Sequence, residues 1–210
     1  IKSNRSIGLR LGINGVFGNM GVAAAPLIIG LLLTVGDWRL CFIGSGLFCI
    51  GYGIVFIMAL AEEAAPKAKP GGKLATGFAP GWRLALGAML LSTASGGFIF
   101  GAMTFVVPRY FEISLPNIST SVAMTGLLAS IVYAVASFTQ IGVGWLIDRV
   151  APKWVLVATG VGQVIFVALA ARFTDYALFF AMLVAMCFVF GQIPITDTIL
   201  SRYVPDHWRA

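Results

Sequence analysis

Charged residues are scarce in this chain. They make up 10% of its 210 residues, whereas hydrophobic residues make up 59%. A soluble domain carries about 25% charged residues, and it does not expose apolar surface on the scale that this composition requires. The shortage of charge therefore excludes an ordinary water-soluble domain and indicates a protein whose solvent is the lipid bilayer.

Side chains that could catalyse a reaction inside a membrane are also scarce. The only histidine is His207, near the polar C-terminal end, and Asp197 is the only acidic residue even marginally inside an apolar run. An intramembrane protease needs a Ser–His pair, two aspartates or a zinc site. The Gly-x4-Gly-Lys-Ser/Thr loop of nucleotide-binding proteins is missing too. We therefore expect no enzyme, although a permease that works with a separate ATPase remains an alternative.

Cysteines and pore loops indicate no other function. Cys41, Cys49 and Cys187 lie inside apolar runs without the spacing of a metal site, so we interpret them as small apolar packing residues. No repeated loop resembles a selectivity filter. A channel and a membrane-embedded interaction protein are therefore the less favoured alternatives, and we expect neither a metal nor another cofactor.

Long apolar runs dominate the sequence. Each is close to or above the ~20 residues that a helix needs to cross a bilayer, and a helix satisfies its backbone polar groups within the segment. None shows the strict alternation of a barrel strand. The sequence therefore predicts an all-α membrane protein with six transmembrane helices. These cover residues 8–34, 39–61, 83–107, 120–146, 154–171 and 176–200.

Basic residues collect on one side of this predicted topology. Most of the Lys and Arg residues precede the first run, follow the last one, or lie in the connections at 62–83 and 147–153, and only Arg39, Arg109 and Arg172 lie on the other side. The positive-inside rule therefore places both ends of the chain in the cytoplasm. Membrane orientation thus accounts for the formal net charge of +6, and we expect no nucleic-acid partner.

A short charged connection separates the fourth and fifth runs. Residues 144–153 contain Gly144, Asp148, Arg149 and Lys153 in the spacing Gly-x-Leu-x-Asp-Arg-x-x-x-Lys. This spacing resembles the cytoplasmic loop signature of the major facilitator superfamily of secondary transporters. The chain departs from that signature at Ala151 and Pro152, where the family prefers a glycine and a basic residue.

The first run carries a second resemblance, to the glycine-proline pattern on the fifth helix of proton-coupled drug antiporters in the same superfamily. Two glycines of that pattern are replaced, by Ala25 and Ile29. Small residues allow a second backbone to approach closely, and a proline removes a backbone donor and bends a helix. The matching residues are Gly12, Gly21, Pro26 and Gly30.

The resemblance implies a twelve-helix fold made of two halves. Residues 1–61 would be the last two helices of the N-terminal half, and 83–210 the first four of the C-terminal half. The Pro- and Gly-rich segment 62–82 would be the cytoplasmic linker. The chain starts with Ile1, so we expect a piece of a longer protein, whose remaining helices, with the bilayer, would be its partners.

The implied function is secondary active transport by alternating access, driven by a proton or another ion. The antiporter pattern favours export by proton antiport, and the scarcity of deep charges favours a small neutral or lipophilic substrate. Proton-coupled uptake of a small metabolite by symport is the alternative. The implied location is the plasma membrane, which is the inner membrane of a bacterium.

The charges at the cytoplasmic ends of the runs suggest a gate. We expect Asp148 to cap the positively polarised start of the first run and Arg149 to pair with Asp197 in a charge relay that includes Lys153. Asp197 could instead carry a proton, although its predicted depth near the interface argues against this role.

Polar and aromatic residues within the runs are candidates for a substrate pocket. Gly pairs and Pro residues interrupt the third and sixth runs, as expected where a transporter helix bends near the midplane. Hydrogen bonding between helices is the alternative role of each polar residue. The candidates are Asn19, Ser95, Phe98, Tyr133 and Gln192.

Overall fold

The computed structural model of this chain describes residues 7–60 and 82–203, and that part consists of helices and short connections. The predicted linker therefore lies outside the described residues, apart from Trp82, which begins α3. The helices are α1 (Ile7–Val35), α2 (Trp38–Leu60), α3 (Trp82–Ser114), α4 (Val122–Ile147), α5 (Pro152–Ala170), α6 (Asp175–Gly191) and α7 (Ile193–Tyr203).

The all-α fold predicted from the sequence is confirmed. Within the described ranges, 6 helical segments are long and apolar enough to cross a membrane, and each corresponds to one predicted run. The sixth is composite: Asp175–Ile199 comprises α6 and most of α7. The chain therefore has the helices of an integral, multi-pass membrane protein.

The third span is longer than the sequence predicted. The apolar run ends at Val107, whereas α3 continues through Pro108 to Ser114. Pro108 has no N–H to donate to the carbonyl of Thr104, one turn earlier. The hydroxyl of Tyr133 in α4 donates to that carbonyl instead, at 2.9 Å. A proline is tolerated inside a membrane helix when another group satisfies the freed backbone atom, which explains why α3 does not stop here.

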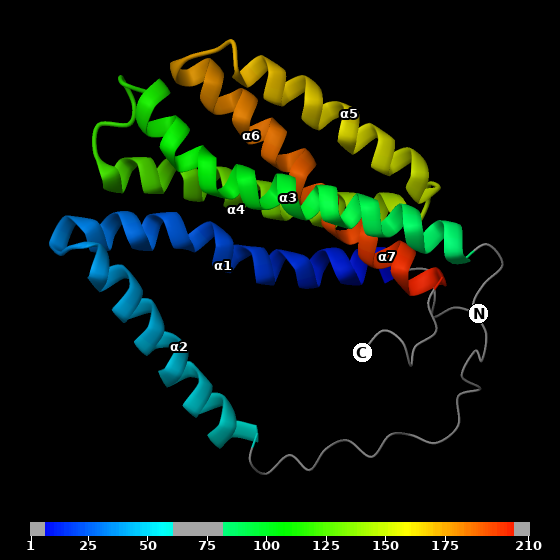
Figure 1. Ribbon diagram of the computed structural model, residues 1–210, viewed down its shortest axis with the longest axis horizontal. Helices are drawn as coiled ribbons and strands as arrows, with labels where there is room; N and C mark the ends of the chain where they lie inside the picture. Colours follow the sequence, from blue (N-terminus) through cyan, green and yellow to red (C-terminus); the bar gives the residue numbers. More distant parts are fainter. Residues whose placement is uncertain (1–6, 61–81, 204–210) are drawn as a thin grey trace.

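A second proline divides the sixth span. The helical run pauses at Gln192, between α6 and α7, and Pro194 stands at the start of α7. A residue that precedes a proline is disfavoured in the helical region, so a break one or two residues before Pro194 is expected. The break lets α7 continue in a different direction from α6, as Figure 1 shows.

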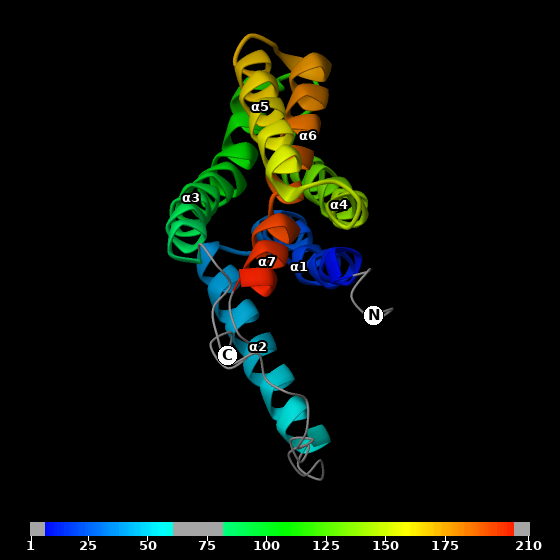
Figure 2. The same cartoon turned by 90° about the vertical axis from the view of Figure 1, so that its right-hand side faces the viewer.

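Helix α4 lies at the centre of the bundle. It packs along α1 on one side and against α3 and α6 on the other, and α5 covers α6 (Figure 1). The core lies between α3, α4 and α6 and includes the fully buried Phe111, Tyr133, Met186 and Phe190. Figure 2 looks along the bundle and shows α7 on the same side as α1, with which it is in contact.

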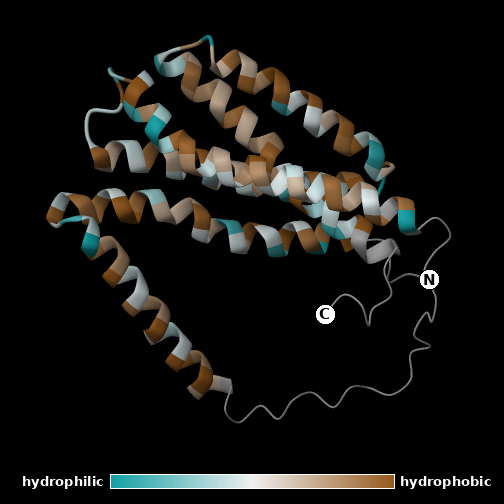
Figure 3. Cartoon of the chain, viewed as in Figure 1, coloured by the Kyte–Doolittle hydropathy of each residue, from teal (hydrophilic) through white to brown (hydrophobic). Residues whose placement is uncertain are grey.

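Helix α2 stands apart from this core. Its main contact in the described structure is with α1, and it projects away from the bundle (Figure 2). It exposes large apolar side chains along its length, among them Phe42, Phe48 and Met58, and Figure 3 shows that apolar residues predominate over most of the helix. Such a surface is stable in contact with lipid or with other apolar helices.

Candidate functional site

The carboxylate of Asp148 caps the first turn of α1. Its two oxygens accept hydrogen bonds from the backbone N–H groups of Gly8 and Leu9, each at 3.0 Å. The first N–H groups of a helix have no partner within the helix, and the helix dipole favours a negative charge at this end. The contact that the sequence predicted between Asp148 and the start of the first run is therefore present.

Glycines allow α1 and α4 to approach backbone to backbone. A Cβ added at Gly8 or at Gly144 would overlap the main-chain carbonyl of the other residue, and one added at Gly12 would overlap the carbonyl of Gln140. Farther along the pair, a Cβ at Gly30 would crowd the main chain of Val122. Backbones of membrane helices come this close only where side chains are very small.

One signature glycine does not take part in this interface. A Cβ at Gly21 would meet nothing within 4 Å in the described structure. Gly21 therefore does not serve the close contact between α1 and α4, and its part in packing against another helix stays a prediction. Gly126 of α4, which the glycine-proline pattern does not include, does take part: a Cβ added there would overlap the main-chain carbonyl of Pro26.

Pro26 lies at a polar contact between the two helices. The backbone N–H of Leu27, which follows it, donates to the hydroxyl of Ser130 in α4 at 3.0 Å. Proline distorts the helix around it, and a neighbouring hydroxyl can satisfy backbone groups that the distortion exposes. At Pro26, α4 therefore supports the backbone of α1 through this hydrogen bond.

A fully buried glutamine lies in the same interface. The side chain of Gln140 has no exposed surface, and its amide oxygen faces Gly15 closely enough that a Cβ there would overlap it. Within the described part of the chain, neither amide atom has a hydrogen-bond partner. An unpaired polar group inside a protein costs about 1–3 kcal/mol, so Gln140 destabilises the packed form of the α1–α4 interface.

The predicted ion pair between Arg149 and Asp197 is not formed between these two described side chains. The guanidinium of Arg149 lies over the ring of Trp145, 3.5 Å from its centroid, one helical turn back. Lys153 lies over its neighbour Trp154, at 5.4 Å. Both cations are therefore held locally by aromatic rings, and Asp148 alone of the predicted gate residues joins α4 to α1.

Asp197 lines a cavity between α3, α5 and the α6–α7 break. The cavity has a volume of about 290 Å³. The lining residues of α3 recur every three or four positions, so they lie on one face of that helix and all border the cavity. The lining residues are Ser92, Thr93, Gly96, Gly97, Phe100, Leu156, Val189, Gln192, Ile193, Thr196 and Asp197.

Residues at and beside the helix break form part of the cavity wall. The Gln192 side chain donates through Nε2 to Oε1 of Gln163 in α5, at 2.8 Å. The hydroxyl of Thr196 turns back to the carbonyl of Ile193 at 3.0 Å. The ring of Phe100 packs against Phe190 of α6, with centroids 5.1 Å apart. These contacts fix the positions of one amide, one hydroxyl and one aromatic ring at the cavity wall.

The structure separates the predicted pocket residues. Gln192 lines the cavity, whereas Tyr133 is buried in the core, where its hydroxyl supports α3. Ser95 and Phe98 lie on an exposed part of α3 outside the lining, and Phe98 is 77% exposed. Asn19 is half-buried on α1 and does not line the cavity either. These last four residues therefore do not line this cavity, and their part in a substrate pocket stays a prediction.

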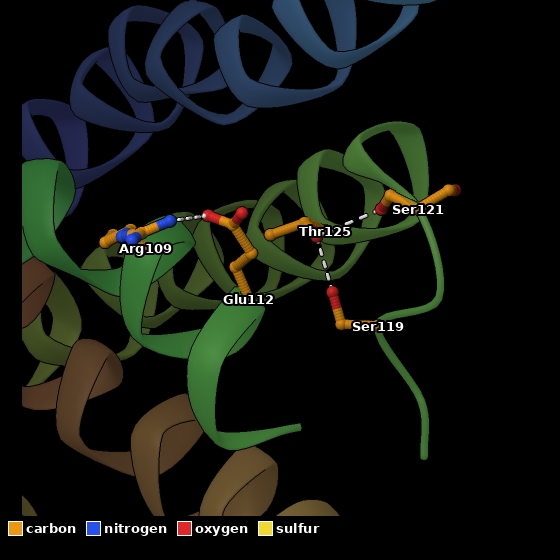
Figure 4. Close-up of polar contacts among 5 residues, drawn as sticks. All are labelled: Arg109, Glu112, Ser119, Ser121 and Thr125. Atoms are coloured by element: carbon orange, nitrogen blue, oxygen red, sulfur yellow. Dashed lines mark hydrogen bonds and ion pairs between the residues drawn. The ribbon is translucent and has the colours of Figure 1, made fainter. Parts of the chain in front are cut away.

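The opposite end of the bundle has its own polar contacts, which Figure 4 shows. Arg109 pairs with Glu112 at 2.6 Å on the last turns of α3. Thr125 donates to the carbonyl of Ser121 at 3.0 Å and its hydroxyl is also bonded to that of Ser119. Arg109, Glu112 and Thr125 line a separate cavity of about 360 Å³ between α1, α3 and α4. Their sequence pattern did not predict this cavity, because polar residues are common at helix ends.

Comparison with known proteins identifies one relationship. A family model described as the Major Facilitator Superfamily matches residues 3–210, nearly the whole chain. Comparisons with curated proteins and with solved structures find no match.

Proposed function

This chain belongs to the major facilitator superfamily of membrane transporters, and we propose that it serves secondary active transport by alternating access. In this proposal residues 1–61 belong to the N-terminal half of the transporter, 62–82 to the linker and 83–210 to the C-terminal half. The cavity beside the α6–α7 break is the proposed substrate site, and the α1–α4 interface is the proposed contact between halves.

The observation that carries the proposal is the cap of Asp148 on α1. Its two hydrogen bonds join residues about 140 positions apart at one end of the bundle. Around them the contact between α1 and α4 is made largely by glycines and main-chain atoms. When such helices separate, water can replace the capped N–H bonds with little loss, so this end of the interface is suited to open and close.

Orientation, coupling and direction follow from the same proposal. We place both ends of the chain, and hence Asp148, on the cytoplasmic side of the plasma membrane, because the basic residues collect there. The glycine-proline pattern on α1 supports proton antiport, with export of a small lipophilic compound. Uptake by proton symport remains the second candidate.

The test is flux in proteoliposomes that contain the transporter to which this chain belongs. The probe is radiolabelled benzyltrimethylammonium, because its permanent charge keeps passive leakage slow. Antiport predicts accumulation against the probe's gradient when the lumen is acidic, symport predicts it when the outside is acidic, and an uncoupler should abolish either. Downhill flux that ignores the proton gradient would instead indicate a channel and contradict the proposal.

A further inference from the structure

Asp197 is the one charged side chain among the residues that line the cavity beside the α6–α7 break. It is exposed rather than packed into the protein, and no described basic side chain forms an ion pair with it. Two nearby cations are engaged elsewhere: Arg149 stacks on Trp145 and Lys153 lies over Trp154. The cavity therefore contains a negative charge that no basic side chain among the described residues pairs with.

The helix break turns this carboxylate toward the bundle. Ile193, Thr196 and Asp197 line the cavity from α7, and their spacing places them on one helix face. The facing residues of α3 include Gly96, near the middle of that 33-residue helix. The cavity that Asp197 lines therefore extends to the middle part of a membrane span, where Gly96 lies beside the Gln192 side chain.

The rest of the lining also suits a positive group. Phe100 presents an aromatic ring to the cavity and is backed by Phe190, and an aromatic face attracts cations. Gln192 and Thr196 supply neutral oxygen atoms. In surroundings of low dielectric constant, an unpaired carboxylate attracts a cation and repels an anion more strongly than it does in water.

An apolar space adjoins this cavity. A second cavity of about 360 Å³ shares Ser92, Leu156 and Thr196 with the first. Its lining is mainly apolar, and its one charged residue is Lys153, whose ammonium lies over the ring of Trp154. A ligand with a charged head and an apolar body could therefore extend from one cavity into the other.

We infer that the substrate carries a positively charged amine or quaternary ammonium group, which binds between the carboxylate of Asp197 and the ring of Phe100. This inference rests on the proposed function, since it takes this cavity as the substrate site. It replaces the expectation of a neutral substrate, which depended on the scarcity of charge within the spans.

The experiment measures equilibrium binding to the purified transporter. The probes are benzyltrimethylammonium and N-benzylacetamide, which have similar size but differ in charge. We expect Asp197→Asn to weaken binding of the cation at least about tenfold, while binding of the neutral probe changes less than about twofold. Asp197→Glu, which keeps the charge, should retain most of the affinity for the cation. Asp37→Asn is the matched control, because it removes one carboxylate at a distant loop.

Two results would overturn the inference: equal weakening of both probes by Asp197→Asn, and unchanged binding of the cation. If the variant keeps its cation binding and its flux in proteoliposomes no longer depends on the proton gradient, Asp197 serves proton coupling instead. A monodisperse elution profile shows that each variant is folded. Selective binding without gradient-driven flux would contradict the proposed transport and leave the cation site standing, so the two failures are distinguishable.

Discussion

At the scale of single residues, the α1–α4 interface assigns different roles to residues that look alike in the sequence. Gly12 and Gly21 belong to the same glycine-proline pattern on the same helix, yet only Gly12 touches the backbone of α4. Gln140 and Gln163 are both buried glutamines in membrane spans, yet only Gln163 has a hydrogen-bonded partner. Each pair therefore offers a matched comparison.

We expect Gly12→Ala to disrupt the interface. Its Cβ would overlap the main-chain carbonyl of Gln140, which cannot rotate away, and overpacking of this kind costs about 1–3 kcal/mol. The unfolding temperature in detergent and the transport flux should both decrease. Gly21→Ala is the control and should change neither, since open space surrounds that position. Equal effects of the two variants would show that the interface does not depend on close backbone contact.

We expect Gln140→Met to stabilise the packed interface. The substitution keeps the approximate volume and removes two buried amide atoms that lack partners, which should gain about 1 kcal/mol. The unfolding temperature should increase, and the form in which α1 and α4 are packed together should become more populated. Gln163→Met, which leaves Gln192 without its partner, should shift unfolding downward. A loss of stability from Gln140→Met as large as that from Gln163→Met would contradict this account.

At the scale of helices, prolines are supported by their neighbours. Helix α3 passes through Pro108 because the hydroxyl of Tyr133 serves the carbonyl of Thr104, and α1 passes through Pro26 beside the hydroxyl of Ser130. The sixth span has a different outcome, with a break at Gln192 just before Pro194. A proline therefore bends or divides a helix here according to what the adjacent helix offers.

This account predicts a specific coupling between two substitutions. Tyr133→Phe alone should destabilise the fold by about 1–2 kcal/mol, because it leaves the carbonyl of Thr104 unpaired in the core. In a Pro108→Ala background the new N–H of residue 108 can serve that carbonyl, so the cost of Tyr133→Phe should largely vanish. Thermal unfolding of the four proteins of this cycle measures the coupling. Strict additivity would mean that Tyr133 does not act through Pro108.

The sequence predicted the helices and the contact of Asp148 with the start of α1. The length of the apolar runs and the placement of charges can be read from the sequence without tertiary structure, and they predicted the membrane spans. They also brought Asp148 to the end of the membrane where the first run begins. The faces of the helices were not predictable in the same way. A helix that is apolar all round carries little periodic signal to tell a buried side from a lipid-facing one. Tyr133 was therefore assigned to a pocket wall although it lies in the core, and Phe98 although it is exposed.

At the scale of the whole molecule, one carboxylate connects the end of α4 to the start of α1. We expect Asp148→Asn to favour opening of the interface on the side where α1 begins. An amide can still accept hydrogen bonds, but it loses the favourable interaction of a full charge with the helix dipole, which contributes about 0.3–2 kcal/mol. The readout is labelling of Thr196→Cys in the cavity by a membrane-impermeant thiol reagent, applied in inside-out vesicles.

Labelling from the side on which α1 begins should increase by a few-fold in the Asp148→Asn background, as this energy implies. Asp37→Asn, a carboxylate at the distant α1–α2 connection, is the control and should leave the labelling rate unchanged. Slower labelling in Asp148→Asn, or equal change in the control, would show that the cap does not hold this side closed.

The cap on α1 joins a side-chain acceptor to main-chain donors, and substitutions affect these two kinds of group differently. One partner is a side chain, Asp148, which a single nucleotide change can alter. The other is a pair of main-chain amides at Gly8 and Leu9, which every amino acid except proline would supply. A genetic screen for transporters with a loosened closure should therefore return many different codons at position 148, but from the start of α1 chiefly prolines and residues too bulky to let α4 approach.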